Sequence, residues 1–248
     1  MKQGKVYQQI INAALAGRKQ LAVLVDPDKT RGDSLKKLAE SAAKAKVDFF
    51  FAGGSLLTNG NIRECVTGLK ENSDIPVILF PGSIQQVIPE ADALLFLSLI
   101  SGRNPDLLIG HHVTAAPFIK KYDLETISTG YTLIDSGGKT TVQYISNTIP
   151  VPADKYDIAA CTAMAGELLG MKMIFAEAGS GAAYPVSEEM IKAIKDSISV
   201  PLITGGGIRT PEKAKANCKA GADIIVIGNT IEKQPELLQQ FADAVFST

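Results

Sequence analysis

The sequence contains few of the residues from which zinc sites and disulfide frameworks are built. Its three cysteines, Cys65, Cys161 and Cys218, lie far apart and form no C-x-x-C pair. Its two histidines, His111 and His112, are adjacent in a stretch that we expect to be an outer helix. Neither a structural zinc site nor a disulfide-stapled fold is therefore predicted, and we assign the two histidines no functional role.

A strong excess of charge and long apolar runs are absent as well. The 248 residues carry a net charge of −1, with a sequence pI of about 6.2, so we expect no nucleic-acid partner and no polybasic membrane patch. The longest apolar stretches, such as residues 93–100, are much shorter than a membrane span, and the N-terminus lacks the apolar core of a signal peptide. The sequence thus predicts a cytoplasmic protein without an integral membrane segment.

Short apolar runs recur along the whole chain. Each is rich in Val, Ile, Leu or Phe with little polar alternation, which is typical of strands covered on both faces in a parallel sheet. Hydrophobic residues make up 46% of the chain, enough for a sizeable core. The eight predicted strands span residues 20–26, 47–54, 76–82, 92–100, 126–134, 171–179, 200–207 and 223–229.

Helix signals lie between these runs. Thr30 followed by Asp33 predicts a capping box, Ser187 predicts a second helix start, and Thr210 a third with proline at the first helical position. Eight strands that alternate with helices over about 250 residues are the signature of a TIM (β/α)8 barrel. We therefore predict a single α/β domain with this fold over residues 1–248. A doubly wound sheet is the alternative.

Two further patterns concern the organisation of this domain. Residues 44–55 and 218–230 both run from a helix end through a small residue and Asp into an apolar strand and Gly, which indicates one repeated strand-helix unit. Residues 136–152 are longer and more polar than the other connections. They predict an ordered insertion or a short hairpin after the fifth strand, and no linker marks a second domain.

Glycine-rich turns follow the seventh and eighth predicted strands. Gly205, Gly206 and Gly207 come after the seventh, and Gly228 and Asn229 after the eighth. In a TIM barrel these two loops frequently bind a phosphate through backbone N–H groups, and glycine lets the backbone approach an anion. The sequence therefore predicts a phosphate cradle, with simple tight turns as the alternative. No complete P-loop or dinucleotide fingerprint supports ATP or NAD.

Oxygen-bearing side chains occupy the ends of other strands. Glu177 ends the sixth strand, where the catalytic groups of this fold lie, and could act as a general base; a structural ion pair is the alternative. Asp26 and Ser55 follow the first and second strands and offer the hard oxygen ligands that Mg²⁺ prefers. Helix caps formed by Asp26 or Asp28 and by Ser55 are an equally good interpretation.

Six motifs, in the order DPDK, FAGGS, SLISGRNP, FAEAGSG, TGGGIRTPEKA and AGADIIVIGN, resemble the geranylgeranylglyceryl phosphate synthase family, which includes bacterial heptaprenylglyceryl phosphate synthases. The resemblance covers about residues 20–232. It implies a TIM barrel that joins a polyprenyl diphosphate, with geranylgeranyl diphosphate as the favoured donor, to the primary hydroxyl of sn-glycerol 1-phosphate. Mg²⁺ would be required, pyrophosphate would be released, and the protein would form a homo-oligomer.

The resemblance also implies roles for individual residues. Asp26 and Ser55 would hold Mg²⁺, Glu177 would take the proton from the attacking hydroxyl, and Tyr131 would contact the substrate. The glycerol phosphate would lie against Phe175, Ala176, Glu177, Ala178, Gly179, Ser180, Gly181, Gly206, Gly207, Gly228 and Asn229.

Two positions depart from the family pattern. Family members commonly carry tyrosine where this chain has Phe175, so no phenol is available there for a hydrogen bond. One branch has a lysine two residues before the metal-binding aspartate, whereas this chain has Leu24. The phosphate contact of that lysine would pass to Lys29 or to the backbone.

A prenyl diphosphate also requires a long apolar groove for its chain. Interior positions of a TIM barrel are packed in layers, so most candidate aromatic residues are expected to be core and one or two to line the groove. The candidates are Phe49, Phe50, Phe51, Phe80, Phe96 and Leu99.

Two other functions are compatible with the same residues. A sugar-phosphate isomerase of the tryptophan or histidine pathway type would share both phosphate-binding turns, and Asp26 could face Glu177 as its acid-base pair. A non-catalytic barrel that binds a phosphorylated metabolite or a lipid tail would need the glycine turns but not the carboxylate beside them. Stimulation by Mg²⁺ and release of pyrophosphate distinguish the prenyltransferase from the isomerase.

Overall fold

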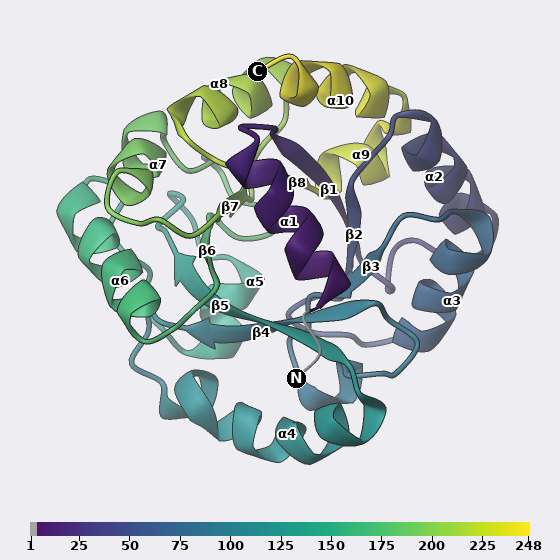
Figure 1. Cartoon of the computed structure of the whole chain (residues 1–248), viewed down its shortest axis with the longest axis horizontal. Coiled ribbons are helices and arrows are strands. Elements are labelled where there is room, and N and C mark those ends of the chain that lie inside the picture. Colours follow the sequence, from purple (N-terminus) through teal and green to yellow (C-terminus); the bar gives the residue numbers. More distant parts are fainter. Residues whose placement is uncertain (1–3) are drawn as a thin grey trace.

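The strands form a closed, all-parallel barrel, as the sequence predicts (Figure 1). A computed structural model describes residues 4–248. Each strand pairs with the next along the chain, and the last pairs with the first, so the doubly wound alternative is wrong. The strands are β1 (Gln20–Val25), β2 (Phe49–Ala52), β3 (Val77–Leu79), β4 (Ala93–Leu99), β5 (Glu125–Leu133), β6 (Met173–Glu177), β7 (Leu202–Gly205) and β8 (Ile224–Ile227).

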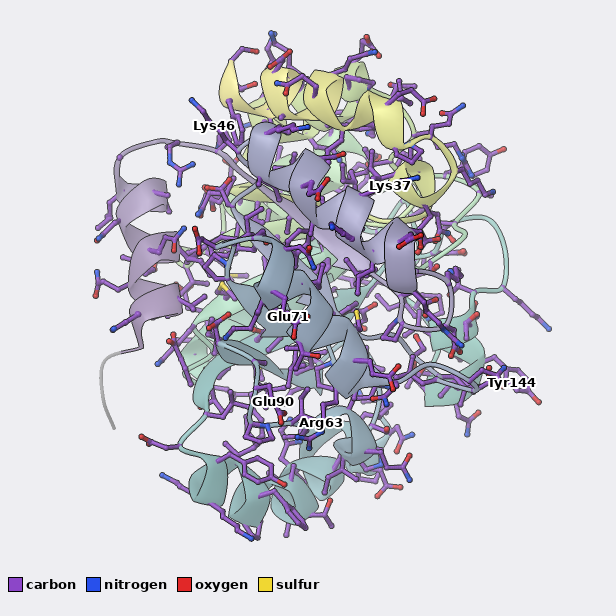
Figure 2. All side chains as sticks on the ribbon, turned by 90° about the vertical axis from the view of Figure 1, so that its right-hand side faces the viewer. Lys37, Lys46, Arg63, Glu71, Glu90 and Tyr144 are labelled. Carbon is purple, nitrogen blue, oxygen red and sulfur yellow. The ribbon has the colours of Figure 1, made fainter. Side chains whose placement is uncertain are left out.

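Helices surround the barrel and cover the outward faces of its strands (Figure 1). Their exposed sides carry charge; Figure 2 shows Lys37 and Glu71 projecting outward from two of them. In the described part no helix is long and apolar enough to cross a membrane. The helices are α1 (Lys5–Leu15), α2 (Gly32–Lys44), α3 (Ile62–Asn72), η1 (Ile84–Gln86), η2 (Asp106–Gly110), α4 (His111–Tyr122), α5 (Thr141–Ser146), α6 (Tyr156–Leu168), α7 (Glu188–Lys195), α8 (Pro211–Ala220), α9 (Asn229–Lys233), η3 (Pro235–Leu237) and α10 (Leu238–Phe246).

Two of the three predicted helix starts are confirmed. The Ser187 hydroxyl accepts the N–H of the third residue of α7, and Thr210 does the same for α8, which begins with proline. The capping box from Thr30 to Asp33 is wrong. The N–H of Thr30 instead donates to the carbonyl oxygen of Asp26 at 3.0 Å, so the loop after β1 continues through Thr30 and α2 begins only after Arg31.

Helix α1 was not predicted, and it crosses one end of the barrel (Figure 1). Its buried residues Val6 and Ile10 pack against the side chains inside the barrel. The Glu125 carboxylate at the start of β5 accepts the N–H groups of Val6 at 3.1 Å and Tyr7 at 2.7 Å. The helix therefore plugs the end of the barrel opposite the carboxyl ends of the strands.

The repeated strand-helix unit has a structural counterpart at the same end. Asp48, directly before β2, accepts the N–H of Leu21 at 2.9 Å. Asp223, before β8, accepts the N–H of Leu202 in β7, also at 2.9 Å. Each aspartate thus ties the start of its strand to the start of the preceding one, which explains why both repeats place Asp before an apolar strand.

The polar segment after β5 is ordered and helical rather than a hairpin. It forms α5 and returns so that Val151 pairs with Ile134 in a parallel bridge. The segment also contacts the loop after β6, because the N–H of Tyr184 donates to the carbonyl oxygen of Ser136 at 3.1 Å. The insertion therefore packs against the loop that follows Glu177.

Candidate functional site

Glu177 is buried at the carboxyl end of β6, where the sequence predicts a general base. The residue is 6% exposed, and its Oε1 accepts the N–H of Gly179 at 2.9 Å. Burial disfavours the charged form and raises the pKa of Glu177 to about 7, although the Gly179 N–H opposes this shift. Among residues 4–248 no ion-pair partner accounts for the Glu177 carboxylate, and a pKa of about 7 places its protonation change near neutral pH.

The glycine turn after β7 makes room for this carboxylate. A Cβ on Gly206 would lie 2.5 Å from Glu177 Oε1 and 2.7 Å from the nitrogen of Gly179, and Gly206 has a φ of +80° that favours glycine. A Cβ on Gly205 would lie 2.8 Å from Glu177 Oε2. Gly205 was predicted as part of the phosphate-binding turn, but its closeness to the Glu177 carboxylate was not predicted. By contrast, Gly228 has a φ of −135°, so its turn does not require the left-handed conformation.

Not every residue from Phe175 to Gly181 can contact a ligand through its side chain. Phe175 points into the barrel, where its ring lies 5.5 Å from that of Phe80. Ala176 and Ala178 are buried in the layer between strands and helices. Those two side chains cannot touch a ligand in the barrel mouth, so any contact there comes from their backbone.

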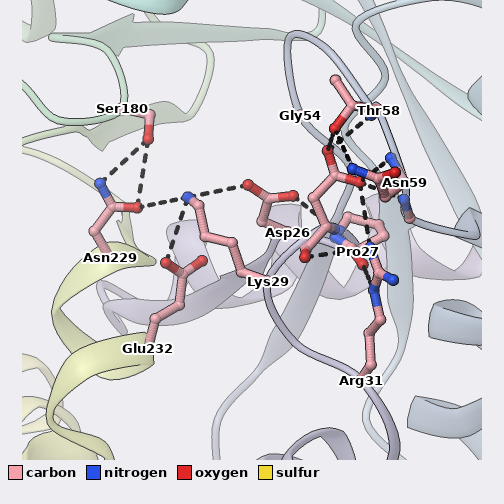
Figure 3. Close-up of polar contacts among 12 residues, drawn as sticks. Asp26, Pro27, Lys29, Arg31, Gly54, Thr58, Asn59, Ser180, Asn229 and Glu232 are labelled. Atoms are coloured by element: carbon pink, nitrogen blue, oxygen red, sulfur yellow. Dashed lines mark hydrogen bonds and ion pairs between the residues drawn. The ribbon is translucent and has the colours of Figure 1, made fainter.

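The loops after β6 and β8 meet at two residues of the predicted phosphate cradle. The Asn229 side-chain amide donates to the Ser180 hydroxyl at 3.2 Å. The Asn229 carbonyl oxygen Oδ1 lies 3.4 Å from the ammonium of Lys29 (Figure 3). The structure thus brings together residues that lie 49 and 200 positions apart in the sequence.

The carboxylates after β1 do not cap the following helix. Asp26 Oδ2 lies 3.0 Å from Lys29 Nζ, and its Oδ1 accepts the N–H of Asp28 at 3.0 Å. Asp28 instead holds the loop after β2, where it accepts the N–H groups of Thr58 at 2.8 Å and Asn59 at 2.9 Å. These backbone donors lower the pKa of Asp28 to about 2. Asp28 therefore braces the loop, and Asp26 faces the mouth of the barrel.

Ser55 lies on that same loop and is not a helix cap either. Asn61 caps α3, because its side chain accepts the N–H groups of Arg63 and Glu64. Ser55 and Gly54 line a cavity at the barrel mouth. In residues 4–248 no group of three or more His, Cys, Asp or Glu side chains could hold a metal ion.

The cavity beside Ser55 has a volume of about 320 Å³ and runs from the barrel mouth along β4 toward α4. Phe80, Phe96 and Leu99 line it, whereas Phe49 and Phe51 are packed in the barrel interior and Phe50 faces the helices. Three of the six candidates therefore line this cavity, and the other three are packed in the core. Its other apolar walls include Ile84, Leu94, Leu107, Ile119 and Val142.

Tyr131 joins this cavity to Glu177. It lines the cavity, and its ring lies 5.4 Å from that of Phe175 in an edge arrangement. Burial and the charge of Glu177 raise the pKa of Tyr131 well above its usual value, so the phenol stays neutral. His112, on α4, also lines the cavity, with Nε2 3.1 Å from the Ser98 hydroxyl. The helix was predicted, but the inward orientation of His112 was missed.

Comparisons with known proteins agree with this geometry. Residues 15–246 match the PcrB family. The chain is 58% identical over 241 residues to the geranylgeranylglyceryl phosphate synthase of Chitinophaga pinensis, covering 97% of this chain and 96% of the relative. It is 53% identical to the Spirosoma linguale protein of the same name, covering 93% of each.

A solved structure supports the same relationship. The (S)-3-O-geranylgeranylglyceryl phosphate synthase of Thermoplasma acidophilum, in complex with its substrate sn-glycerol-1-phosphate, superimposes with a TM-score of 0.90 at 32% identity. The alignment covers 98% of this chain and 99% of that protein. The chain therefore belongs to the PcrB family, together with the geranylgeranylglyceryl phosphate synthases that it resembles in sequence and fold.

Proposed function

We propose that this enzyme transfers a prenyl group, with geranylgeranyl diphosphate as the favoured donor, to sn-glycerol 1-phosphate. The names of its relatives and the substrate bound to its structural neighbour support this activity. The observation that carries it is the place of Glu177, a buried carboxylate with a pKa of about 7. It lies beside the glycine turn at Gly206, and burial together with its charge raises the pKa of Tyr131, which lines the apolar cavity.

Three groups of residues carry out three functions in the reaction: binding the phosphate, binding the prenyl chain and accepting the proton. The turns at Gly206, Gly207, Gly228 and Asn229 hold the phosphate of glycerol phosphate, and the prenyl chain lies in the cavity beside Phe80, Phe96 and Leu99. The glycerol hydroxyl oxygen bonds to the first prenyl carbon, the bond from that carbon to the diphosphate breaks, and pyrophosphate leaves. Glu177 accepts the hydroxyl proton.

We assign Mg²⁺ to Asp26 and Ser55. The donor set fits this ion, because Mg²⁺ usually binds one or two carboxylates and completes its shell with water and substrate phosphates. Asp26 supplies such a carboxylate and remains 22% exposed at the barrel mouth. When bound, the ion would neutralise charge on the leaving diphosphate.

Substitution of Asp26 by Asn should raise the Mg²⁺ concentration needed for half-maximal activity by at least about tenfold, because the site loses its carboxylate. Activity and calorimetric Mg²⁺ binding in the presence of a prenyl diphosphate measure the effect. Asp154→Asn is the matched control, since that exposed aspartate pairs with Lys155 away from the site. Wild-type activity of Asp26→Asn at limiting Mg²⁺ would show that Asp26 is not a metal ligand.

The activity should depend on the protonation of Glu177. The base must be ionised, and the pKa of Glu177 in the free protein is about 7, so kcat/KM should rise roughly tenfold per pH unit below pH 7 and level off above it. The second ionisation of glycerol phosphate, near pH 6 as for other phosphate monoesters, adds a separate step. A profile without a transition near pH 7 would contradict the assignment of Glu177.

The function itself is tested by incubating the purified protein with sn-glycerol 1-phosphate, Mg²⁺ and a series of prenyl diphosphates. We expect an ether product, identified by mass spectrometry, and release of one pyrophosphate per product. An isomerase would turn over a sugar phosphate without pyrophosphate release, and its acid Asp26 would have to leave Lys29, 3.0 Å away. Absence of ether product with every donor would reject the proposal.

We also propose that the enzyme is a cytoplasmic homo-oligomer. Large apolar side chains are exposed on α4, α5, α6 and adjacent segments, and a second copy of this chain would cover them. These exposed apolar side chains include Ile109, Val113, Phe118, Tyr144, Ile149, Ile158 and Leu168. Figure 2 shows Tyr144 projecting from the surface.

Light scattering should therefore give a mass that is a multiple of 26.3 kDa for the wild type. The double variant Val113→Glu, Ile149→Glu should lower that mass, because it places charge among the apolar side chains. Lys37→Glu on the charged face of α2 is the control. A monomeric wild type would reject the proposal.

A further inference from the structure

Lys29 lies where the first and last strands of the barrel meet. Its ammonium is 3.0 Å from Asp26 Oδ2, after β1, and 3.5 Å from Glu232 Oε2, in α9 after β8. It is also 3.4 Å from Asn229 Oδ1, and the same Asn229 side chain bonds to Ser180 (Figure 3). Lys29 thus contacts both the carboxylate assigned to the diphosphate half of the site and a residue assigned to the phosphate cradle.

Glu232, in α9, forms an ion pair with this lysine (Figure 3). Its side chain is only 14% exposed, whereas that of Lys29 is 48% exposed. Lys29 therefore has one contact anchored at the largely buried Glu232 side chain, while its own side chain is about half exposed.

A cation beside the phosphate cradle would strengthen the binding of a phosphate. Its assigned contacts are backbone N–H groups and the neutral side chains of Ser180 and Asn229, while Glu177 adds negative charge nearby. Arg209 is close in sequence to the glycine turn, but its guanidinium donates to the carbonyl oxygens of Ala182 at 2.7 Å and Ala183 at 2.9 Å. With Arg209 engaged in this way, Lys29 remains a cationic side chain in direct contact with a residue of the cradle.

We propose that Lys29 binds the phosphate of the acceptor substrate, and that Glu232 is the positioning residue that holds its ammonium between the two halves of the site. The inference rests on the proposed function. On phosphate binding, the flexible Lys29 side chain exchanges its contact with Asp26 for a contact with a phosphate oxygen. The Oδ2 atom of Asp26 is then free to act as a ligand in the half of the site that binds the prenyl diphosphate. Binding of glycerol phosphate thereby prepares the diphosphate half of the site.

The test is calorimetric titration of the metal-free protein with sn-glycerol 1-phosphate. Lys29→Met should weaken the affinity by about 10- to 100-fold, the factor expected for loss of one charge-assisted hydrogen bond, and Lys29→Arg should restore much of it. Lys192→Met is the control, because it removes an exposed lysine in the last turn of α7 that pairs with Asp196 at 2.9 Å. Unchanged affinity of Lys29→Met, or equal losses for Met and Arg, would overturn the proposal.

Glu232→Gln tests the positioning role separately. It keeps the shape of the side chain but removes the charge, so the affinity should fall by a smaller factor than in Lys29→Met, and KM for the acceptor should rise while kcat changes little. Unchanged KM would remove Glu232 from this role. A wild-type protein that neither binds sn-glycerol 1-phosphate nor forms the ether would reject the proposed function itself. Failure of the variants alone would reject only the assignments of Lys29 and Glu232.

Discussion

Glu177→Gln should lower kcat by about 10² to 10⁴ while binding of sn-glycerol 1-phosphate largely survives. Glutamine keeps the shape of the side chain, and its carbonyl oxygen can still accept the N–H of Gly179, which Glu177 Oε1 accepts at 2.9 Å. What disappears is the negative charge that takes the proton of the attacking hydroxyl. Because this interaction matters mainly in the transition state, kcat and kcat/KM should fall together.

Steady-state kinetics and calorimetry on the same preparation separate these two effects. Glu189→Gln, at an exposed position near the start of α7, is the matched control and should leave both quantities unchanged. If ionisation of the prenyl diphosphate limited the rate and the alcohol attacked without assistance, kcat of Glu177→Gln would stay near the wild-type value. That result would show that Glu177 is not the general base, even if the ether product had been identified.

Gly206→Val should abolish detectable binding of glycerol phosphate. A Cβ at this position would lie 2.5 Å from Glu177 Oε1, and the φ of +80° is unfavourable for a branched side chain. The turn would have to move away from the loop after β6, so the backbone N–H groups of the cradle would no longer converge on one anion. Calorimetry on the folded variant measures the loss, and inorganic phosphate should compete with substrate in the wild type.

Gly17→Val distinguishes a specific effect from general backbone strain. Gly17 has a similar φ of +71°, but an added Cβ there would meet no heavy atom within 4 Å. It lies between α1 and β1, at the other end of the barrel from the cradle. Gly17→Val should therefore lose some stability but keep its affinity for glycerol phosphate. If Gly206→Val bound glycerol phosphate with the same affinity as the wild type, the glycine turn would have only a structural role.

The barrel could be predicted from the sequence because each strand carries its own local signal. Continuous apolar runs such as residues 223–229 mark strands buried on both faces. Chain order then places their carboxyl ends, with Asp26 and Glu177, at one mouth. The start of α2 was mispredicted because the capping pattern at Thr30 competed with a turn that uses its N–H for Asp26. The α1 helix was missed although Val6, Ile10 and Ala13 have helical spacing.

Other parts of the site had no local signal. The contact between Lys29 and Glu232 joins residues whose neighbours in sequence suggest only a charged loop and a charged helix. Gly205 matters because a Cβ added at this position would lie too close to the Glu177 carboxylate. The two residues come close together only when β6 and β7 pair. Likewise, His112 turns toward the cavity because α4 packs its Ala115 and Ile119 inward with it. Such pairings are products of tertiary structure.

The pairing of β1 with β8 also sets the moment in protein synthesis at which the substrate can first be bound. Lys29 is made 200 residues before Asn229, an interval of roughly 10 to 40 s at elongation rates of about 5 to 20 residues per second. Until the last strand leaves the ribosome, the apolar strand β1 has one unpaired edge that can associate with other nascent chains. A high substrate concentration cannot protect the chain during this interval, because Asn229, which belongs to the proposed phosphate cradle, lies in the segment synthesised last.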